Sequence, residues 1–232
     1  MAIGTSSEVG GTWAVLVAGG SGARLGADRP KAFAALRGRP LLAESLERLE
    51  RSGWIDAIVV VAPPGWEEPA ILLAEELVAT KVVSVVAGGG TRAESVRAGL
   101  AEVGPEALVV IVHDAARPLL EEDVLERVMA PLGEGWDGAV PALQVADTVK
   151  RVDGRQIVET VDRNDLMVVQ TPQAFRADVL REAFSGDLTG ATDCASLVER
   201  RGGRVCVVEG DRRLLKVTTG EDLAAAERLL AG

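Results

Sequence analysis

Short apolar runs alternate with amphipathic stretches along most of this chain, and the alternation restricts the possible folds more than any other feature. Runs with the length of single buried strands are predicted at residues 13–17, 57–62, 82–87, 107–112 and 138–142. Between them, apolar residues recur at helical spacing, as Leu42, Leu46 and Leu49 do. This order predicts an α/β fold with a doubly wound, mainly parallel sheet that binds ligands at the carboxyl ends of its strands.

The helices that follow are marked by capping residues and acidic first turns. Thr91 and Glu94 have the spacing of a capping box before a helix at 92–102, and acids open a helix at 121–132. The remaining predicted elements are a strand at 204–209 and helices at 177–184, 193–200 and 221–230.

One segment breaks the alternation of strands and helices. Residues 147–161 alternate at period two around Asp153-Gly154, a dipeptide typical of a hairpin turn. Two strands alone cannot bury the apolar side chains of such a hairpin, which are Val149, Val152, Ile157 and Val161. The sequence therefore predicts a protruding β-hairpin arm, at about 144–165, that packs on another surface.

Length and composition are those of one globular domain. The 232 residues are 47% hydrophobic, enough for a sizeable core, and we expect a flexible tail at 1–11 and a single domain at 12–232. No apolar run approaches the ~18 residues of a membrane span, and the first residues lack the pattern of a signal peptide. We therefore expect a cytoplasmic protein without a membrane partner. A net charge of −10 argues against nucleic-acid binding.

Histidine and cysteine usage narrows the possible chemistry. His113 is the single histidine, which excludes a His-rich metal site and disfavours a Ser-His-Asp triad. We expect it to be packed or hydrogen-bonded rather than to act as a base. Cys194 and Cys206 lack metal-ligand spacing and suit a reduced interior.

Glycines follow the first predicted strand, in the segment "LVAGGSGARLGADRPKAF" at residues 16–33. A dinucleotide-binding fold would place an acid after the second strand, but that strand ends in "APP". A P-loop would close on Gly-Lys-Ser/Thr, which is absent here. The cations Arg24, Arg29 and Lys31 come directly after the glycines. We therefore predict a triphosphate loop, with backbone N–H groups on the oxygens and cations at the reacting phosphate.

Two more strand ends carry polar residues. "GGGTRAESV" at 88–96 has more glycines than a helix cap requires, and these suit a flat base lying against bare backbone, with Arg92 and Ser95 as polar contacts. "VHDAARP" at 112–118 places Asp114 at a strand end, where it can meet a hydroxyl or a divalent ion. An Asp114–Arg117 ion pair that stabilises the turn explains these two residues equally well. Lys216 lies between apolar residues in a strand-like context, which indicates an anionic partner.

Together these segments resemble the 2-C-methyl-D-erythritol 4-phosphate cytidylyltransferases of the non-mevalonate isoprenoid pathway. The resemblance runs from about residue 13 to 230 and rests on an ordered set of motifs: AGGSGARLG…PK, GGxxRAxSV, HDAARP, DT, VDR, QTPQ, TD and KVT. It implies a Rossmann-like nucleotidyltransferase fold, transfer of CMP from CTP to the 4-phosphate of methylerythritol, release of diphosphate, and a requirement for Mg²⁺. A ribitol-5-phosphate cytidylyltransferase is the nearest alternative, and a nucleotide-binding regulator without turnover is a more distant one.

The resemblance also implies roles for individual residues. Those implied to be catalytic are Arg24, Lys31, Arg163 and Lys216, of which Arg24 and Lys31 would stabilise the α-phosphate. Those implied to bind CTP are Ala18, Gly19, Gly20, Ser21, Gly22, Gly89, Gly90, Arg92, Ser95, Asp114 and Ala115. Those implied to bind the methylerythritol phosphate are Asp114, Arg117, Thr148, Arg163, Thr171, Thr192 and Lys216.

Metal and partner expectations follow from the same resemblance. Mg²⁺ would be held mostly by the CTP phosphates, with Asp114 as the one protein ligand. The arm would embrace a second subunit in a homodimer, so that Thr148 and Arg163 would serve the partner's site.

Overall fold

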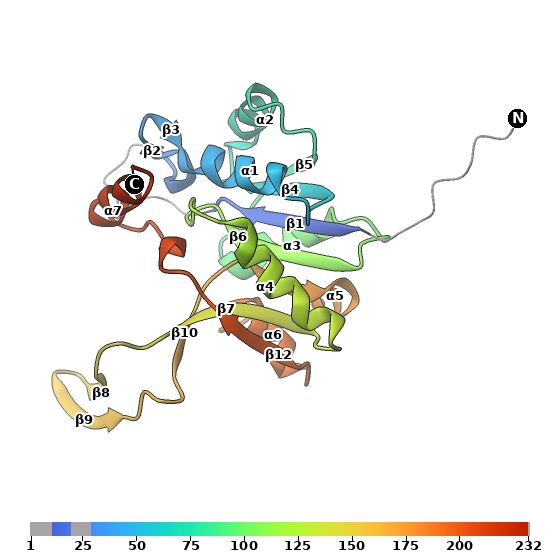
Figure 1. Cartoon of the computed structure of the whole chain (residues 1–232). Coiled ribbons are helices and arrows are strands. Elements are labelled where there is room, and N and C mark those ends of the chain that lie inside the picture. The colour runs from blue at the N-terminus through green and yellow to red at the C-terminus, as the bar shows by residue number, and fades with distance from the viewer. Residues whose placement is uncertain (1–10, 20–28, 232) are drawn as a thin grey trace, which may run out of the picture.

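The computed structural model describes residues 11–19 and 29–231, and an eight-stranded sheet forms the centre of this part (Figure 1). Its strands are β1 (Thr12–Val17), β4 (Ala57–Ala62), β5 (Val82–Ala87), β6 (Val109–Asp114), β7 (Gly138–Gln144), β10 (Met167–Val169), β11 (Gln173–Arg176) and β12 (Val205–Glu209). The order is β10-β7-β11-β6-β1-β4-β5, and β12 also pairs with β7. β5, β4, β1 and β6 are mutually parallel, as β12 and β7 are, whereas β10 and β11 run antiparallel to their neighbours.

Helices cover both faces of the sheet, as a doubly wound fold requires. They are α1 (Leu41–Arg51), α2 (Glu67–Glu76), α3 (Arg92–Ala101), α4 (Glu122–Gly133), α5 (Ala177–Phe184), α6 (Cys194–Arg200) and α7 (Gly220–Leu229). Leu16 and Val60 pack with α1, α2 and α4, while their neighbours Val15 and Val61 pack with α3, α5 and α6. Successive strand residues point to opposite faces, so the continuous apolar runs of β1 and β4 supply two cores at once. The predicted fold class is confirmed.

Several predicted boundaries need correction. The strand expected at 107–112 is β6 at Val109–Asp114, because Leu108 bonds to Gly11 outside the ladder and is 62% exposed. β5 has the predicted bounds but is only partly buried, because it is the edge strand of the sheet. Lys216 lies in an irregular segment after a 3-10 helix, η3 (Arg212–Leu214), and not in a strand. The helix α2 and the strands β10 and β11 were not predicted.

The arm is a separate hairpin of β8 (Val149–Asp153) and β9 (Gln156–Val161), and Figure 1 shows it projecting from the body. Its register pairs Asp153 with Gln156, so the turn consists of Gly154 and Arg155, one residue later than predicted. Gly154 has φ +55°, which glycine adopts at low cost. Large apolar side chains remain more than half exposed on this arm, namely Val152, Ile157 and Val158.

The N-terminal tail was predicted at 1–11, and its last residue is joined to the body. Residues 1–10 lie outside the described residues, whereas the carbonyl of Gly11 accepts a hydrogen bond from Leu108 at 3.0 Å. In the ranges 11–19 and 29–231, every helix is too short or too polar to cross a lipid bilayer.

Candidate active site

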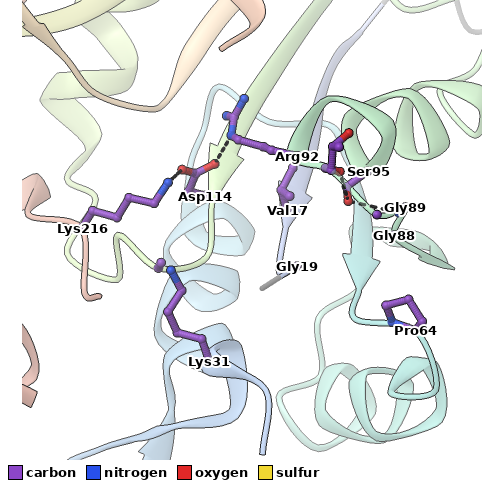
Figure 2. Close-up of a pocket in the computed structure, with 13 residues that line it drawn as sticks. Val17, Gly19, Lys31, Pro64, Gly88, Gly89, Arg92, Ser95, Asp114 and Lys216 are labelled. Atoms are coloured by element: carbon purple, nitrogen blue, oxygen red, sulfur yellow. Dashed lines mark hydrogen bonds and ion pairs between the residues drawn. The ribbon is translucent and has the colours of Figure 1, made fainter. Parts of the chain in front are cut away.

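Asp114 is the last residue of β6, and its carboxylate joins two cations from distant parts of the chain. Arg92 Nε, in the first turn of α3, donates to Oδ1 at 2.9 Å, and Lys216 Nζ donates to Oδ2 at 2.6 Å (Figure 2). Asp114 is 5% exposed, so its charge would be costly without these partners. With two cations on one anion, the cluster has a net positive charge beside the cavity that these residues line.

The electrostatics of this cluster keep Asp114 and Arg92 ionised. Burial would raise the pKa of Asp114, but Arg92 and Lys216 together hold it well below its usual range. Burial would likewise lower the pKa of Arg92, but the nearby Asp114 raises it above its ordinary value. A carboxylate with a strongly lowered pKa is a poor general base. Asp114 therefore acts as an anchor that sets the positions of Arg92 and Lys216.

Lys31 lines the same cavity. It begins a 3-10 helix, η2 (Lys31–Phe33), directly after Pro30, and Phe33 packs on Trp66 with ring centroids 4.7 Å apart. Lys31 and Lys216 both line the cavity, and Figure 2 shows them entering it from two different segments. Two of the predicted catalytic cations, Lys31 and Lys216, thus line the cavity that Asp114 also lines.

The glycine turn between β5 and α3 forms another wall of this cavity. Residues 88–90 line it, and the N–H of Gly89 donates to Ser95 Oγ at 3.1 Å. Ser95 in turn donates to the carbonyl of Thr91 at 2.9 Å. Thr91 and Glu94 form the predicted capping box. The turn is therefore held on the first turn of α3, with its backbone facing the cavity.

Packing against α3 explains part of this glycine run. A Cβ on Gly89 would lie 2.4 Å from Glu94 Cβ and 3.3 Å from the Glu94 carbonyl carbon, which leaves no room for a side chain. A Cβ on Gly90 would meet only the flexible end of Glu94, at 3.3 Å. Gly89 is thus required by the helix start itself, and Gly90 is the better probe of the predicted base pocket.

We expect alanine at these two positions to have different effects. Gly89→Ala overpacks the turn and should lower stability by about 1–3 kcal/mol, or several degrees in Tm. Gly90→Ala should leave Tm nearly unchanged but raise KM for CTP, because its methyl group would meet a base that lies against the backbone. Thermal melts and CTP kinetics on both variants check this. A Gly90→Ala enzyme with unaltered KM for CTP would remove Gly90 from the base pocket.

A second cavity adjoins the first and shares Arg92, Asp114 and Lys216 with it. The predicted acceptor residues Arg117, Thr171 and Thr192 line this second cavity. The structure therefore brings five of the predicted acceptor-binding residues together, namely Asp114, Arg117, Thr171, Thr192 and Lys216. Since the shared cluster lies between the cavities, a ligand in either one meets the same two cations.

Arg117 and Arg92 each keep a buried nitrogen without a hydrogen-bond partner among the described residues. These atoms are Arg117 Nε and Arg92 Nη2. Arg117 otherwise donates to the carbonyl of Leu214, and Arg92 Nη1 lies 3.7 Å from Cys194 Sγ. Burial lowers the pKa of Arg117. In this part of the chain the ion pairs of Asp114 are with Arg92 and Lys216, so the alternative Asp114–Arg117 ion pair is not formed.

His113 is fully buried beneath this second cavity. Its Nε2 lies 3.1 Å from the carbonyl oxygen of Arg117, and its Nδ1 lies 3.2 Å from Thr171 Oγ1. Burial lowers its pKa to about 4, and this outweighs the nearby Asp114 and the hydrogen bond to the Arg117 carbonyl, which both raise the pKa. The ring is neutral at physiological pH and hydrogen-bonded on both sides, as the sequence predicted.

We expect His113 to make the protein less stable in mild acid. The unfolded chain binds a proton on this ring below about pH 6.5, whereas the folded chain does so only below about pH 4. The free energy of unfolding should therefore fall as the pH drops from 6.5 to 4, by roughly 3 kcal/mol at most. Urea unfolding across this range checks the slope. His113→Gln, which does not titrate, should give a flatter curve, and an equal slope would contradict the assignment.

Other predicted site residues lie elsewhere or outside the described part. Thr148 and Arg163 are exposed at the base of the arm, where Arg163 donates to the carbonyl of Ala146. Within one chain they do not line either cavity. Gly20, Ser21, Gly22 and Arg24 lie outside the described residues.

The three remaining CTP-binding candidates lie at the ends of β1 and β6. Gly19 lines the first cavity, whereas Ala18 and Ala115 are buried next to it. The N–H of Ala18 donates to Val61, and the N–H of Ala115 donates to Val17. Their roles in CTP binding stay predictions.

Two buried glutamines beside Thr171 were missed. The side chain of Gln170 pairs with the backbone of Asp211 through two hydrogen bonds, of 2.8 and 3.0 Å. Gln173 donates to Asp193 Oδ2 at 2.9 Å and accepts from the N–H of Cys194 at 3.2 Å. They join the segment that leads to Lys216 and the start of α6 to the same corner. The sequence signal for them was the pair of glutamines that flank Thr171-Pro172. Glutamines are seldom buried, so this pair was not expected to belong to the site.

Comparisons with known proteins bear on this geometry. The family model for 2-C-methyl-D-erythritol 4-phosphate cytidylyltransferase matches residues 12–232. A protein of this name from Saccharopolyspora erythraea is 47% identical over 94% of this chain and 98% of its own length. One from Nocardia farcinica is 46% identical over 95% and 94%. A solved 2-C-methyl-D-erythritol 4-phosphate cytidylyltransferase from Thermus thermophilus superposes with a TM-score of 0.76 at 32% identity, covering 94% of this chain and 98% of that one.

The doubly wound sheet, with glycines and cations converging at the carboxyl ends of its strands, defines the chain as an α/β nucleotidyltransferase. The comparisons then identify the family of nucleotidyltransferases. The chain belongs to the 2-C-methyl-D-erythritol 4-phosphate cytidylyltransferase family.

Proposed function

We propose that this enzyme transfers CMP from CTP to 2-C-methyl-D-erythritol 4-phosphate and releases diphosphate. The observation that carries the proposal is the cluster of Lys216, Asp114 and Arg92, which two adjoining cavities share and which Lys31 approaches across the first. A reaction between two phosphates needs cations where the two meet. The named relatives favour the methylerythritol acceptor over ribitol 5-phosphate.

The protein contributes to this reaction mainly by positioning the two substrates and by stabilising negative charge. An oxygen of the acceptor phosphate attacks the α-phosphorus of CTP, and the bond to the diphosphate leaving group breaks. A phosphate monoester is ionised at neutral pH, so no general base is required. Lys31 and Lys216 would stabilise the negative charge that develops on the α-phosphate, together with Arg24. Asp114 would keep Lys216 in place, and the backbone of residues 88–90 would face the cytosine.

Mg²⁺ fits this site mainly through the nucleotide. Over the described ranges, no group of three or more His, Cys, Asp or Glu side chains converges. Among the described residues that line the first cavity, Asp114 is the one with a carboxylate, and both its oxygens already hold cations. Mg²⁺ commonly binds through one or two carboxylates and substrate phosphates. When bound, it would neutralise phosphate charge, and Asp114 is the residue that could hold it from the protein side.

The arm supports a homodimer as part of this proposal. Val152, Ile157 and Val158 are 58%, 59% and 52% exposed, a larger apolar surface than a free hairpin tolerates. A second copy that packs on the arm would cover these side chains and would bring Thr148 and Arg163 to the partner's acceptor cavity. We also propose a cytoplasmic location, which the free thiols of Cys194 and Cys206 support.

A diphosphate-release assay tests the proposed function. With Mg²⁺ and CTP, the enzyme should turn over methylerythritol 4-phosphate far faster than ribitol 5-phosphate. GTP in place of CTP should be a poor donor, because a purine is larger than the cytosine that would lie against the backbone of residues 88–90. Preference for ribitol 5-phosphate would overturn the acceptor, and equal turnover of GTP and CTP would overturn the base pocket.

A further inference from the structure

We propose that His113 is a positioning residue that holds Thr171 and the Arg117 loop in one geometry and turns the Thr171 hydroxyl proton away from the substrate. The inference rests on the proposed function, because that function makes the cavity lined by Arg117 and Thr171 the acceptor side of the site. His113 itself is 0% exposed and lines neither of the two cavities. It would act through the two groups to which it is hydrogen-bonded.

The hydrogen bonds assign the tautomer of the ring. The carbonyl oxygen of Arg117 can only accept, so the proton must be on His113 Nε2, 3.1 Å away. In the neutral ring, Nδ1 is then an acceptor, and the Thr171 hydroxyl donates to it across 3.2 Å. The N–H of Asp114 donates to the same hydroxyl oxygen at 3.0 Å. One directed chain of hydrogen bonds therefore runs from the backbone of Asp114 through Thr171 and His113 to Arg117.

This direction limits what Thr171 can offer a substrate. A threonine hydroxyl has one proton and two lone pairs. The proton is given to His113, and one lone pair accepts from Asp114. The remaining lone pair can accept a hydrogen bond from a substrate hydroxyl, but no proton is left to donate to a phosphate oxygen. Thr171 thus favours a hydroxylated part of the acceptor, and the phosphate is left to Arg117 and Lys216.

Two parts of the acceptor cavity depend on the same ring. His113 joins the turn after β6, which carries Arg117, to the corner between β10 and β11, which carries Thr171. Arg117 Nε is buried there without a partner in the described ranges, so its position is held by few other polar contacts. Loss of the ring nitrogens would release both groups, while the glycine turn at residues 88–90 would keep its own contacts with α3.

Nuclear magnetic resonance can test the tautomer without any substrate. His113 is the single histidine, so a tag-free chain labelled with ¹⁵N gives one pair of imidazole nitrogen signals. We expect a proton on Nε2 and none on Nδ1 at pH 7. A proton on Nδ1, or a ring that titrates like an exposed histidine, would overturn the proposal. This result does not depend on which reaction the enzyme catalyses.

Kinetics of substituted enzymes can test the consequence for the acceptor. His113→Gln keeps a donor near the Nε2 position but loses the Thr171 contact, and Thr171→Val loses the same contact from the other side. Each should raise KM for methylerythritol phosphate about 10-fold and change KM for CTP less than about twofold. The double variant should be no worse than Thr171→Val alone, because Thr171→Val already removes the hydrogen bond that His113→Gln removes. Thr171→Ser should restore most of the affinity.

A matched control separates this positioning from a general loss of stability. Thr80 Oγ1 donates to Glu50 at 2.8 Å, and Thr80 lines neither of the two cavities. Thr80→Val should lower Tm without changing either KM. Additive effects in the double variant, or equal increases in KM for both substrates, would overturn the proposal. If His113→Gln fails to fold, the Thr171 pair of variants and the imidazole signals still decide. If the wild type fails to use methylerythritol phosphate, the proposed function fails, but the tautomer is still tested.

Discussion

Replacement of Lys31 with alanine is expected to lower kcat for CMP transfer about 100-fold or more, with a much smaller rise in KM for CTP. Lys31 lines the cavity that Lys216 and Asp114 also line. A cation at this place strengthens its interaction as charge develops on the α-phosphate, so it lowers the energy of the transition state more than that of bound CTP. Steady-state kinetics with CTP varied at saturating acceptor measure both constants.

Two further variants make this test specific to position and charge. Lys31→Arg keeps the charge with a different shape and should retain part of the lost rate. Arg51→Ala removes a cation whose side chain is 76% exposed, at the end of α1 and away from the cavity, and should leave kcat unchanged. A Lys31→Ala enzyme with wild-type kcat would remove Lys31 from the mechanism.

The parts of the fold predicted correctly are those that one buried segment determines by itself. The runs that form β4 and β5 end where the structure ends them, because valines and alanines give way to proline or glycine at both C-termini. Thr91 and Glu94 were sufficient to locate the start of α3, because a capping box is a local interaction.

The elements that were missed depend on contacts between distant segments. β11 spans Gln173–Arg176, has no apolar periodicity of its own, and forms because β6 and β7 offer it ladders on both sides. The end of β6 was placed too early because His113 and Asp114 are polar, yet they pair with Leu16 and Val17. A sequence pattern cannot show that a polar residue has such a neighbour.

The sequence predicted which residues belong to the candidate site, but not which of them form hydrogen bonds and ion pairs with one another. Arg92 was assigned to the cytosine side, and the structure shows its Nε on Asp114, at the boundary between the two cavities. Asp114 finds its partners 22 and 102 residues away, so no local spacing could identify them. Local spacing could not identify the hydrogen bond between His113 and Thr171 either, because the two residues are 58 apart in the sequence.

The position of the arm bears on which chain completes each active site, so a substitution at its base should have a large effect on activity. Arg163 is exposed at the base of the arm and lines neither cavity of its own chain. If the arm packs on a second copy of this chain, Arg163 can supply a cation to the acceptor phosphate in the partner's site. Arg163→Ala should then raise KM for methylerythritol phosphate and leave CTP binding nearly unaltered.

Mixing two variants that are each nearly inactive at subsaturating acceptor is expected to restore activity. In a dimer of one Arg163→Ala chain and one Lys31→Ala chain, a shared site would have both residues intact on one side and neither on the other. Random reassortment of equal amounts should then give about one quarter of the wild-type rate, since half of the dimers are mixed and half of their sites are whole. Lys31→Ala mixed with Lys216→Ala is the matched control, because both lysines line the cavity of one chain and no site can be whole. If Arg163 acts within its own chain, the first mixture stays as inactive as the control. A dilute monomer with full activity would also refute the shared site.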